Sequence, residues 1–492
     1  MVDESPNLGR RAVRGVGVTL IGQGVRVVTQ LVGTVLLARL LMPADFGLMA
    51  IVLSVVAFGE LVRDFGLTLG AARAPELTHG QRSNLFWLNT VLGAIVGAAV
   101  WASAGVVSRV FDEPALQNIC HWMAVFVVLS GISAQFRAEL NRDLRFVALA
   151  VTETMAAVLG LAVGVAVAAS DGTYRALIAQ QIAVAVVILV SAVAMSRWLP
   201  GLPRRDESVR DILRFGAGLF GTQLVAFLPR NADNLVLGMT ASPATLGLYS
   251  RAYQLLMLPL NQLAAPLTRI AVPVLSRVRH DRGEFERYVG RSQAFSAIAM
   301  VFFYASMIGL AEPAVLVVFG PNWADMVPIF QLLAIGGAFR SLTQLTFWIF
   351  LALDESARQF RFNLWAQQTV TVLVVLGAAW GPLGVAVGHS VGYFVYWILS
   401  VLWCLPKTSP LRRQILLDGL VSLCAILVPV AAVGRAIVEF VPGPAIVVVL
   451  VGVTACAATL LFVILVTPRL KALTFPAVAV VRRHLRRSAG AA

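Results

Sequence analysis

Apolar runs of about 20 residues or more follow one another along nearly the whole chain, and only short polar segments separate them. A run of this length forms a helix that can cross the hydrocarbon core of a bilayer. The pattern therefore predicts an all-α polytopic membrane protein with about 14 transmembrane helices. The expected spans lie near residues 15–41, 46–62, 84–108, 116–136, 147–169, 176–196, 215–239, 247–268, 292–311, 326–353, 362–380, 382–405, 414–434 and 445–467.

The composition agrees with this pattern and excludes a soluble protein. Of the 492 residues, 59% are hydrophobic and only 13% are charged, and the mean hydropathy is +0.83. A soluble domain carries roughly 25% charged residues, because its surface faces water. We expect the first apolar run to be retained as a span, since it is too long for a signal-peptide core and no cleavage site is evident.

The basic residues are distributed unevenly between the two sets of connections. With fourteen spans, 31 of the 39 Lys and Arg residues fall in the termini and the even-numbered connections, while the opposite connections hold only Arg109, Arg175 and Arg435. The positive-inside rule then places both termini in the cytoplasm. The net charge of +14 is explained by topology and by contact with anionic membrane lipids, so no nucleic-acid partner is expected.

An internal sequence repeat indicates that the chain consists of two similar halves. Residues 43–48 (PADFGL) match residues 243–248 (PATLGL) at Pro, Ala, Gly and Leu, and Gln23 and Gln223 stand at equal distances before them. In a hydrophobic chain, such repeats are typical of transporters whose site lies between the halves. We expect an N-terminal lobe over 1–200, a C-terminal lobe over 201–406 and an appended pair of spans with a basic tail over 407–492.

Two polar stripes occupy equivalent places in these halves. Span 1 carries Gln23, Arg26 and Gln30 at helical spacing, so that they share one face. Span 7 carries a matching set of polar residues, which are Gln223, Arg230, Asn231, Asp233 and Asn234. Ionisable residues are costly inside a membrane and usually face a partner or a cavity, so the stripes predict a water-filled central cavity.

For the charged members of the stripes a purely structural role stays open beside the cavity. Arg230 and Asp233 are three residues apart and could pair on their own helix. Arg26 has no acid nearby in sequence. It either pairs across to another helix or faces the cavity and an anionic ligand. Its possible partners in the first case are Glu60, Asp64 and Glu153.

Weaker candidates lie in the second half. Arg340 and Gln344 are one turn apart on span 10 and could extend the cavity lining. His389 in span 12 could shuttle protons or could simply form a hydrogen bond between helices. No phosphate-binding loop, dinucleotide fingerprint, metal-ligand cluster or activated nucleophile is evident, so we expect no cofactor, no metal and no enzymatic activity.

Several segments resemble bacterial polysaccharide (oligosaccharide-lipid) flippases, over roughly residues 10–405. The similar segments are residues 37–47 at the exit of span 1, 230–238 and 246–253 around the turn between spans 7 and 8, and 319–323 after span 9. The chain is most similar to the branch of colanic-acid and teichuronic-acid exporters. That branch belongs to a superfamily which also holds multidrug extruders and lipid II flippases.

This resemblance implies two six-helix lobes and two extra helices that move an undecaprenyl-pyrophosphate-linked sugar repeat unit from the cytoplasmic to the periplasmic leaflet of the cell membrane by alternating access. Polysaccharide polymerase or export proteins are the implied partners. Arg26, Arg230 and Arg340 would screen the pyrophosphate. The sugar-binding side chains would be Gln23, Gln223, Asn231, Asn234 and Tyr253, and Gln30 and Gln344 would complete the lining. The candidates for ion coupling are Asp233, Glu60, Glu153 and His389.

Three rival functions remain open. An ion-coupled drug extruder of the same superfamily should have a site dominated by buried carboxylates, whereas these stripes are rich in Arg and Gln. A non-transporting scaffold of the polysaccharide machinery should pack the two stripes dry against each other. A membrane glycosyltransferase is disfavoured, because no acidic catalytic pair lies in a large outer loop.

Overall fold

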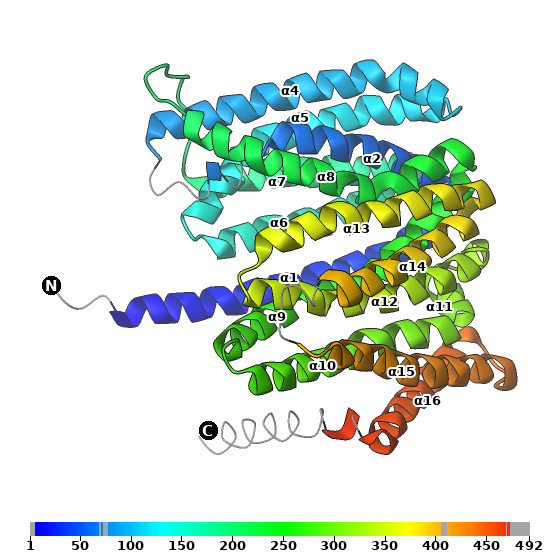
Figure 1. Cartoon of the computed structure of the whole chain (residues 1–492). Coiled ribbons are helices and arrows are strands. Elements are labelled where there is room, and N and C mark those ends of the chain that lie inside the picture. The colour runs from blue at the N-terminus through cyan, green and yellow to red at the C-terminus, as the bar shows by residue number, and fades with distance from the viewer. Residues whose placement is uncertain (1–4, 68–69, 72–76, 405–410, 469, 473–492) are drawn as a thin grey trace. The chain divides into compact units, whose positions relative to one another are not determined.

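The computed structural model describes residues 5–67, 70–71, 77–404, 411–468 and 470–472, and within these ranges the chain is helical without strands (Figure 1). The all-α prediction is therefore confirmed. Each of the fourteen predicted spans coincides with one long helix. These helices are α1 (Ser5–Leu40), α2 (Pro43–Asp64), α4 (His79–Val110), α5 (Ala115–Arg142), α6 (Phe146–Asp171), α7 (Arg175–Ser196), α8 (Arg210–Thr240), α9 (Pro243–Val278), α10 (Arg282–Gly309), α12 (Met326–Ala352), α13 (Ser356–Gly377), α14 (Gly381–Leu399), α15 (Arg413–Phe440) and α16 (Ala445–Val466).

Most of these helices have the length and apolarity of a membrane span. Eleven helices in the described part of the chain qualify, and a twelfth is added if Pro243–Ala264 and Pro266–Val278 form one bent span. That count takes Ser356–Leu402 as one helix and does not include α1. The multi-pass architecture is therefore established, while the number fourteen stays a prediction.

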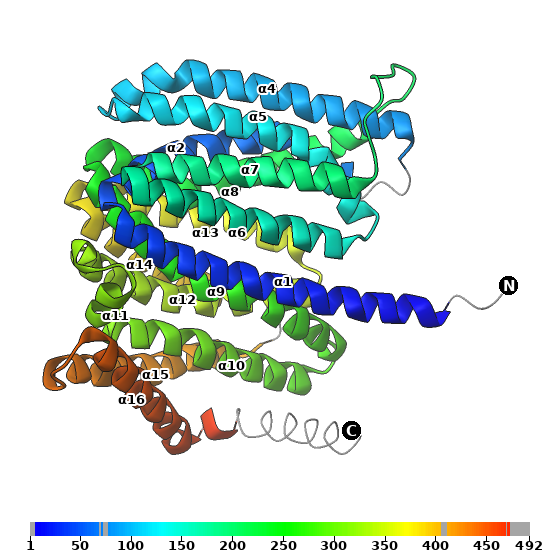
Figure 2. The same ribbon diagram turned by 180° about the vertical axis from the view of Figure 1, so that it is seen from behind.

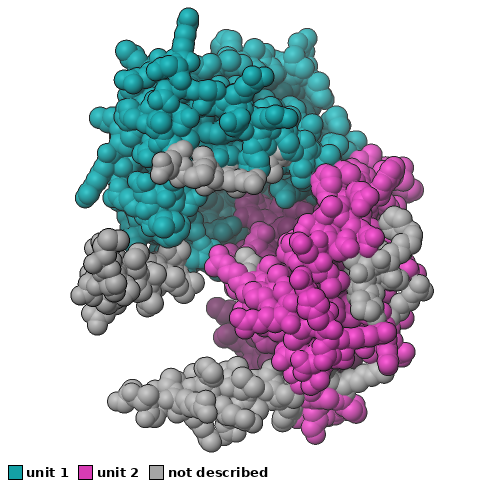
Figure 3. All heavy atoms as spheres, turned by 60° about the vertical axis from the view of Figure 1, so that its left-hand side comes forward, with its two compact units in different colours: residues 1–247 teal, residues 248–492 magenta. Residues whose placement is uncertain are grey.

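The chain forms two compact units, residues 1–247 and residues 248–492 (Figure 3). The first unit contains α1 to α8, and the second contains nearly all of α9 and every later helix. The division into lobes at residue 200, with a separate C-terminal pair of spans, stays a prediction.

In the first unit, neighbouring helices pack as antiparallel pairs, α4 with α5 and α6 with α7, which lie side by side in both views (Figures 1 and 2). α5 also packs on α7, α1 packs on α6, and α2 contacts α4, α5 and α8. Apolar side chains of α2, including Phe46, Ile51 and Val52, are almost completely buried in this bundle. Burial of α2 therefore holds the helices of the first unit together.

In the second unit, α12 contacts α10 and α14, which in turn pack on α15 and α13. α16 packs on α15 and on the short helix α11 (Ala311–Val318), which follows α10. The eight largest of the fully buried side chains in the described part of the chain are aromatic and all belong to this unit, among them Trp323, Trp348 and Tyr304. α12 is consequently the central helix of this unit, and residues on it are enclosed from several sides.

The two repeated Pro-Ala-x-x-Gly segments contact each other within the first unit. A Cβ atom at Gly47 would overlap the carbonyl oxygen of Pro243 and would lie 3.0 Å from the backbone nitrogen of Gly247. A Cβ atom at Gly247 would overlap the carbonyl oxygen of Pro43 and would lie 3.1 Å from the nitrogen of Gly47. The contact is thus reciprocal, and glycine is required at both positions because backbone meets backbone.

The segment between α7 and α8 is bound to the N-terminal end of α4. Thr78 caps α4, and its hydroxyl accepts a hydrogen bond from the Gln81 amide nitrogen at 3.1 Å. One turn later, the Asn84 side chain donates to the carbonyl oxygens of Arg204 and Glu207 at 2.7 Å and accepts from the Arg204 amide at 2.8 Å. Ser83 accepts from the Gly201 amide at 2.9 Å. Residues 197–209, although rich in Pro, Gly and charge, are therefore an ordered part of the first unit.

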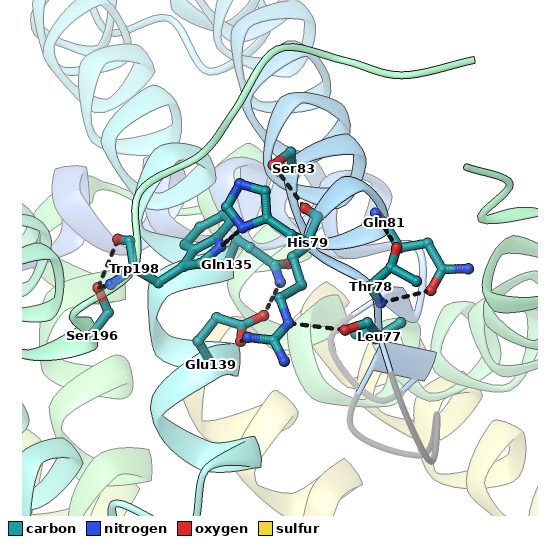
Figure 4. A network of polar contacts seen from close by, with 10 residues as sticks. Leu77, Thr78, His79, Gln81, Ser83, Gln135, Glu139, Ser196 and Trp198 are labelled. Carbon is teal, nitrogen blue, oxygen red and sulfur yellow. Dashed lines mark hydrogen bonds and ion pairs between the residues drawn. The ribbon is translucent and has the colours of Figure 1, made fainter. Parts of the chain in front are cut away.

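The buried carboxylate of Glu139 lies next to residues 197–209, the segment bound to α4 (Figure 4). Glu139 of α5, whose side chain is only 2% exposed, forms an ion pair with Arg82 of α4 at 3.2 Å and accepts a hydrogen bond from Gln135 at 2.8 Å. Arg82 also donates to the carbonyl oxygen of Leu77 at 3.2 Å, which ties the start of α4 to α5. Nearby, the Trp198 indole donates to His79 at 3.3 Å.

The glycine contact predicts that Gly47→Ala destabilises the purified protein by about 1–3 kcal/mol or more, because the added methyl group must displace backbone. Thermal unfolding in detergent measures the effect. Gly105→Ala is the matched control, since no atom lies within 4 Å of a Cβ there, and it should stabilise α4 by about 0.5–1 kcal/mol. Equal unfolding temperatures for the two variants would contradict the contact.

The ion pair predicts that Arg82→Ala destabilises the first unit by about 3–5 kcal/mol, since Glu139 would be left buried without its cation. The double variant Arg82→Ala with Glu139→Gln removes that charge and should recover most of the loss. Thermal unfolding of both variants gives the comparison. A double variant no more stable than the single one would show that the charge of Glu139 is not the cause.

Candidate functional site

The predicted span 1 stripe lies on α1 in the first unit, and its cation is paired. Arg26 forms an ion pair with Glu153 of α6 and donates a second hydrogen bond to Gln23, one turn earlier on its own helix. Glu153 is shared, because Arg137 of α5 also pairs with it at 3.3 Å. Of the partners left open for Arg26, the structure selects Glu153. Gln30 is exposed further along α1.

Glu60, which was considered as a partner of Arg26, pairs with Arg63 instead. It accepts hydrogen bonds from Arg63 on the same helix, from Nη2 at 2.7 Å and from Nε at 3.2 Å. The Arg63 side chain is only 9% exposed, so this pair lies inside the bundle. Each partner keeps one buried atom without a hydrogen bond, Oε1 of Glu60 and Nη1 of Arg63.

The span 7 stripe lies on α8. Arg230 is exposed there and forms no ion pair with any described residue, so the suggested pairing with Asp233 is not made. Asp233 is buried instead, and its carboxylate accepts from the Asn234 amide at 2.9 Å. The Asn231 side chain donates to the Phe227 carbonyl oxygen of its own helix at 3.0 Å. Gln223 is half-buried near the start of the stripe.

In the second unit, Arg340 of α12 is held by tyrosines. Its guanidinium lies 4.8 Å from the ring centroid of Tyr393 on α14 and donates to the hydroxyl of Tyr253 on α9 at 3.4 Å. No carboxylate among the described residues forms an ion pair with it. Aromatic faces and hydroxyls stabilise a guanidinium without neutralising it. The positive charge of Arg340 is therefore available to a ligand, and all three side chains are half-buried.

A buried layer lies behind this guanidinium. His389, 3% exposed, packs between Tyr253 and Tyr393, with ring centroids 5.6 and 4.8 Å away, and neither of its ring nitrogens has a hydrogen-bond partner in the described chain. Tyr304 of α10 is fully buried and donates to the Leu256 carbonyl oxygen at 2.9 Å. Sequence reasoning had proposed Tyr253, Arg340 and His389 separately, and the fold brings them together.

The sequence alone did not identify Arg63, Arg137 or Tyr393 as members of these polar clusters. Arg137 was counted only as a topology marker at the end of span 4, and Arg63 likewise at the end of span 2. Tyr393 stands four residues after His389, a helical spacing that could have identified it. Gln344 is half-buried one turn after Arg340 and is not part of the aromatic cluster.

These arrangements favour anionic ligands over cations. The carboxylates Glu60, Glu139 and Glu153 are each bound by arginine, whereas Arg230 and Arg340 have no acidic partner in the described chain. Uncompensated guanidinium groups recognise phosphate and carboxylate groups. Among the described residues, no group of His, Cys, Asp and Glu has the arrangement of a metal site.

Comparison with known proteins identifies relatives of this chain. The chain is 26% identical over 390 residues to the lipopolysaccharide biosynthesis protein WzxC of Escherichia coli (strain K12), a match that covers 78% of this chain and 77% of that protein. It is 25% identical over 341 residues to the teichuronic acid biosynthesis protein TuaB of Bacillus subtilis (strain 168), covering 68% and 70%.

Solved structures share the fold. The lipid II flippase MurJ in an inward closed conformation matches with a TM-score of 0.70 at 14% identity, over 90% of this chain and 97% of that chain. An inward-facing multidrug resistance transporter of the MATE family, from the MOP superfamily, matches with a TM-score of 0.57 at 15% identity, over 80% and 96%. The family model of polysaccharide biosynthesis proteins matches residues 36–328. The chain therefore belongs to the polysaccharide biosynthesis protein family.

Proposed function

We propose that this chain is a flippase that moves a lipid-linked oligosaccharide across a bacterial cell membrane during synthesis of a surface polysaccharide. Its membership of the polysaccharide biosynthesis family and its similarity to WzxC and TuaB support a place in such a pathway. The uneven distribution of basic residues supports cytoplasmic termini. The expected direction of transport is from the cytoplasmic to the periplasmic leaflet.

The observation that carries the proposal is that the guanidinium of Arg340 has no acidic partner in the described chain. A cation inside a membrane protein is costly unless a ligand or a partner compensates it. Arg340 contacts tyrosines and no carboxylate in the described chain, and Arg230 on α8 likewise has no acidic partner there. A pyrophosphate-linked head group supplies the missing negative charge, and the Tyr253 hydroxyl is placed to bond a phosphate or sugar oxygen as well.

The pairing of the acidic groups argues against a cation extruder. A site for a cationic drug requires a carboxylate that is free to meet it, and Glu60 and Glu153 are bound by Arg63, Arg26 and Arg137. Asp233, which is buried on α8, and His389, whose ring nitrogens have no hydrogen-bond partner in the described chain, remain the candidates for coupling to an ion. Polysaccharide polymerase or export proteins are the partners we expect.

The proposal predicts that Arg340→Ala lowers export by about tenfold or more, because a charge-assisted hydrogen bond to the cargo is lost. The test expresses variants in a bacterium that lacks this protein, and it measures surface polysaccharide together with the accumulated lipid-linked intermediate. Arg340→Lys keeps the charge and should retain part of the activity. Arg109→Ala, at the end of α4, is the control that should export normally.

The stripes on α1 and α8 give a second prediction in the same assay. Arg26→Ala and Arg230→Ala should each abolish export while the protein remains in the membrane at normal abundance. Normal surface polysaccharide in both variants would refute the idea that these stripes line the transport path.

A further inference from the structure

A cavity of about 360 Å³ lies inside the first unit, between α2, α5, α6 and α7. Its polar lining comes from three of these helices and consists of Glu60, Arg63, Ser130, Ser133, Arg137, Asn141 and Gln181. The remaining lining is apolar and includes the ring of Phe126. Every lining residue belongs to residues 1–247, so the cavity is complete within one unit.

Several polar groups of this lining are unused. The side chains of Ser130, Asn141 and Gln181 form no hydrogen bond with any described residue, and Oε1 of Glu60 and Nη1 of Arg63 are also without a partner. Of these groups, only Oε1 of Glu60 and Nη1 of Arg63 are buried, whereas Ser130 and Gln181 are half-buried and Asn141 is exposed. Buried polar groups left unpaired cost free energy, and native proteins rarely retain two side by side without a use for them. The two buried unpaired atoms, together with three accessible polar side chains beside them, therefore indicate a polar ligand.

The charge around the cavity is not balanced. Among the described residues that line it, Arg63 and Arg137 are basic and Glu60 alone is acidic. Glu153, outside the lining, is shared between Arg137 and Arg26. Three guanidinium groups thus face two carboxylates, which leaves one positive charge for the ligand to compensate. A ligand with a single carboxylate suits this site, since guanidinium groups bind carboxylates in two-pronged geometry.

The rest of the lining suits a sugar ring. Each sugar hydroxyl donates and accepts at once, and amides and a carboxylate supply both kinds of partner within one small volume. The Phe126 ring offers an apolar surface for the C–H face of the ring. The volume is near the lower limit of ligand pockets, roughly 300–1,000 Å³, which limits the ligand to one or two rings.

We propose that this cavity binds one sugar residue of the cargo and prefers a sugar that carries a carboxylate. Arg63 and Arg137 bind the carboxylate, while Gln181, Asn141 and Ser130 bind hydroxyls. The inference rests on the proposed function, because it assigns the sugar to the transported repeat unit. It adds a selective site within the first unit to the charge-compensating site at Arg340.

The experiment titrates the purified full-length protein in detergent with D-glucuronate, D-glucose and inorganic phosphate, and follows binding by saturation-transfer NMR. D-glucuronate should bind more tightly than D-glucose by about tenfold or more. Gln181→Ala should weaken D-glucuronate binding by about fivefold to tenfold, through the loss of its hydrogen bonds. Gln180→Ala is the matched control, because its side chain packs against Gly164 on α6 and does not line the cavity.

A charge variant separates the carboxylate from the ring. Arg137, whose side chain is 44% exposed, can be changed to Gln without burying an unpaired group. Arg137→Gln should weaken D-glucuronate binding at least about tenfold and leave D-glucose binding within about twofold. An equal loss for both sugars would overturn the assignment of the carboxylate to this arginine.

The remaining outcomes are also decisive. Absence of D-glucuronate binding, or binding that Gln181→Ala leaves unchanged, overturns the proposal. Phosphate binding as tight as that of D-glucuronate would mean that the cavity selects charge alone. Export in the complementation assay tests the proposed function separately. A wild-type protein that binds D-glucuronate but never restores export refutes the flippase function and leaves the sugar site standing. Normal export without sugar binding refutes the sugar site and leaves the flippase function standing.

Discussion

The cost of an unpaired charge away from water governs where this protein places its ionisable residues. A helical membrane protein has a low-dielectric interior, in which an isolated carboxylate or guanidinium must find a partner. In the first unit the carboxylates of α2, α5 and α6 each meet an arginine from the same or a neighbouring helix. Except for the Glu60–Arg63 pair within α2, these ion pairs connect helices that otherwise contact each other through apolar side chains and closely packed glycines.

Because an isolated charge is costly, the arginines without acidic partners indicate a negatively charged ligand. Tyrosine rings and hydroxyls hold Arg340 in place without cancelling its charge, and Arg230 is exposed on α8. The anionic, lipid-linked cargo that we propose would account for both. The polar cavity inside the first unit adds a different property, because hydroxyl-binding groups surround its charge. Compensation of charge and selection of the sugar are then assigned to separate places.

The architecture could be predicted from the sequence to a large extent, since apolar runs of spanning length report directly on helices. The pairing of charges could not, because it depends on which helices become neighbours. Arg26 and Glu153 are 127 residues apart, and nothing local distinguishes Glu153 from Glu60 as a partner. Arg63 and Arg137 were interpreted as markers of topology, since they stand at the ends of their spans. The aromatic support of Arg340 also required the fold, which brings α9, α12 and α14 together.

The reciprocal contact of Gly47 and Gly247 has a consequence for the origin of the chain. Each glycine approaches the carbonyl oxygen of the other segment's proline, so the two segments exchange the same interaction. An interaction of this kind is isologous, the form that a two-fold axis imposes on identical subunits. A half-length ancestor could therefore have formed this contact as a homodimer before gene fusion. The repeated segments would then persist because each copy is the binding partner of the other, and the backbone contact leaves no room for a side chain at either glycine.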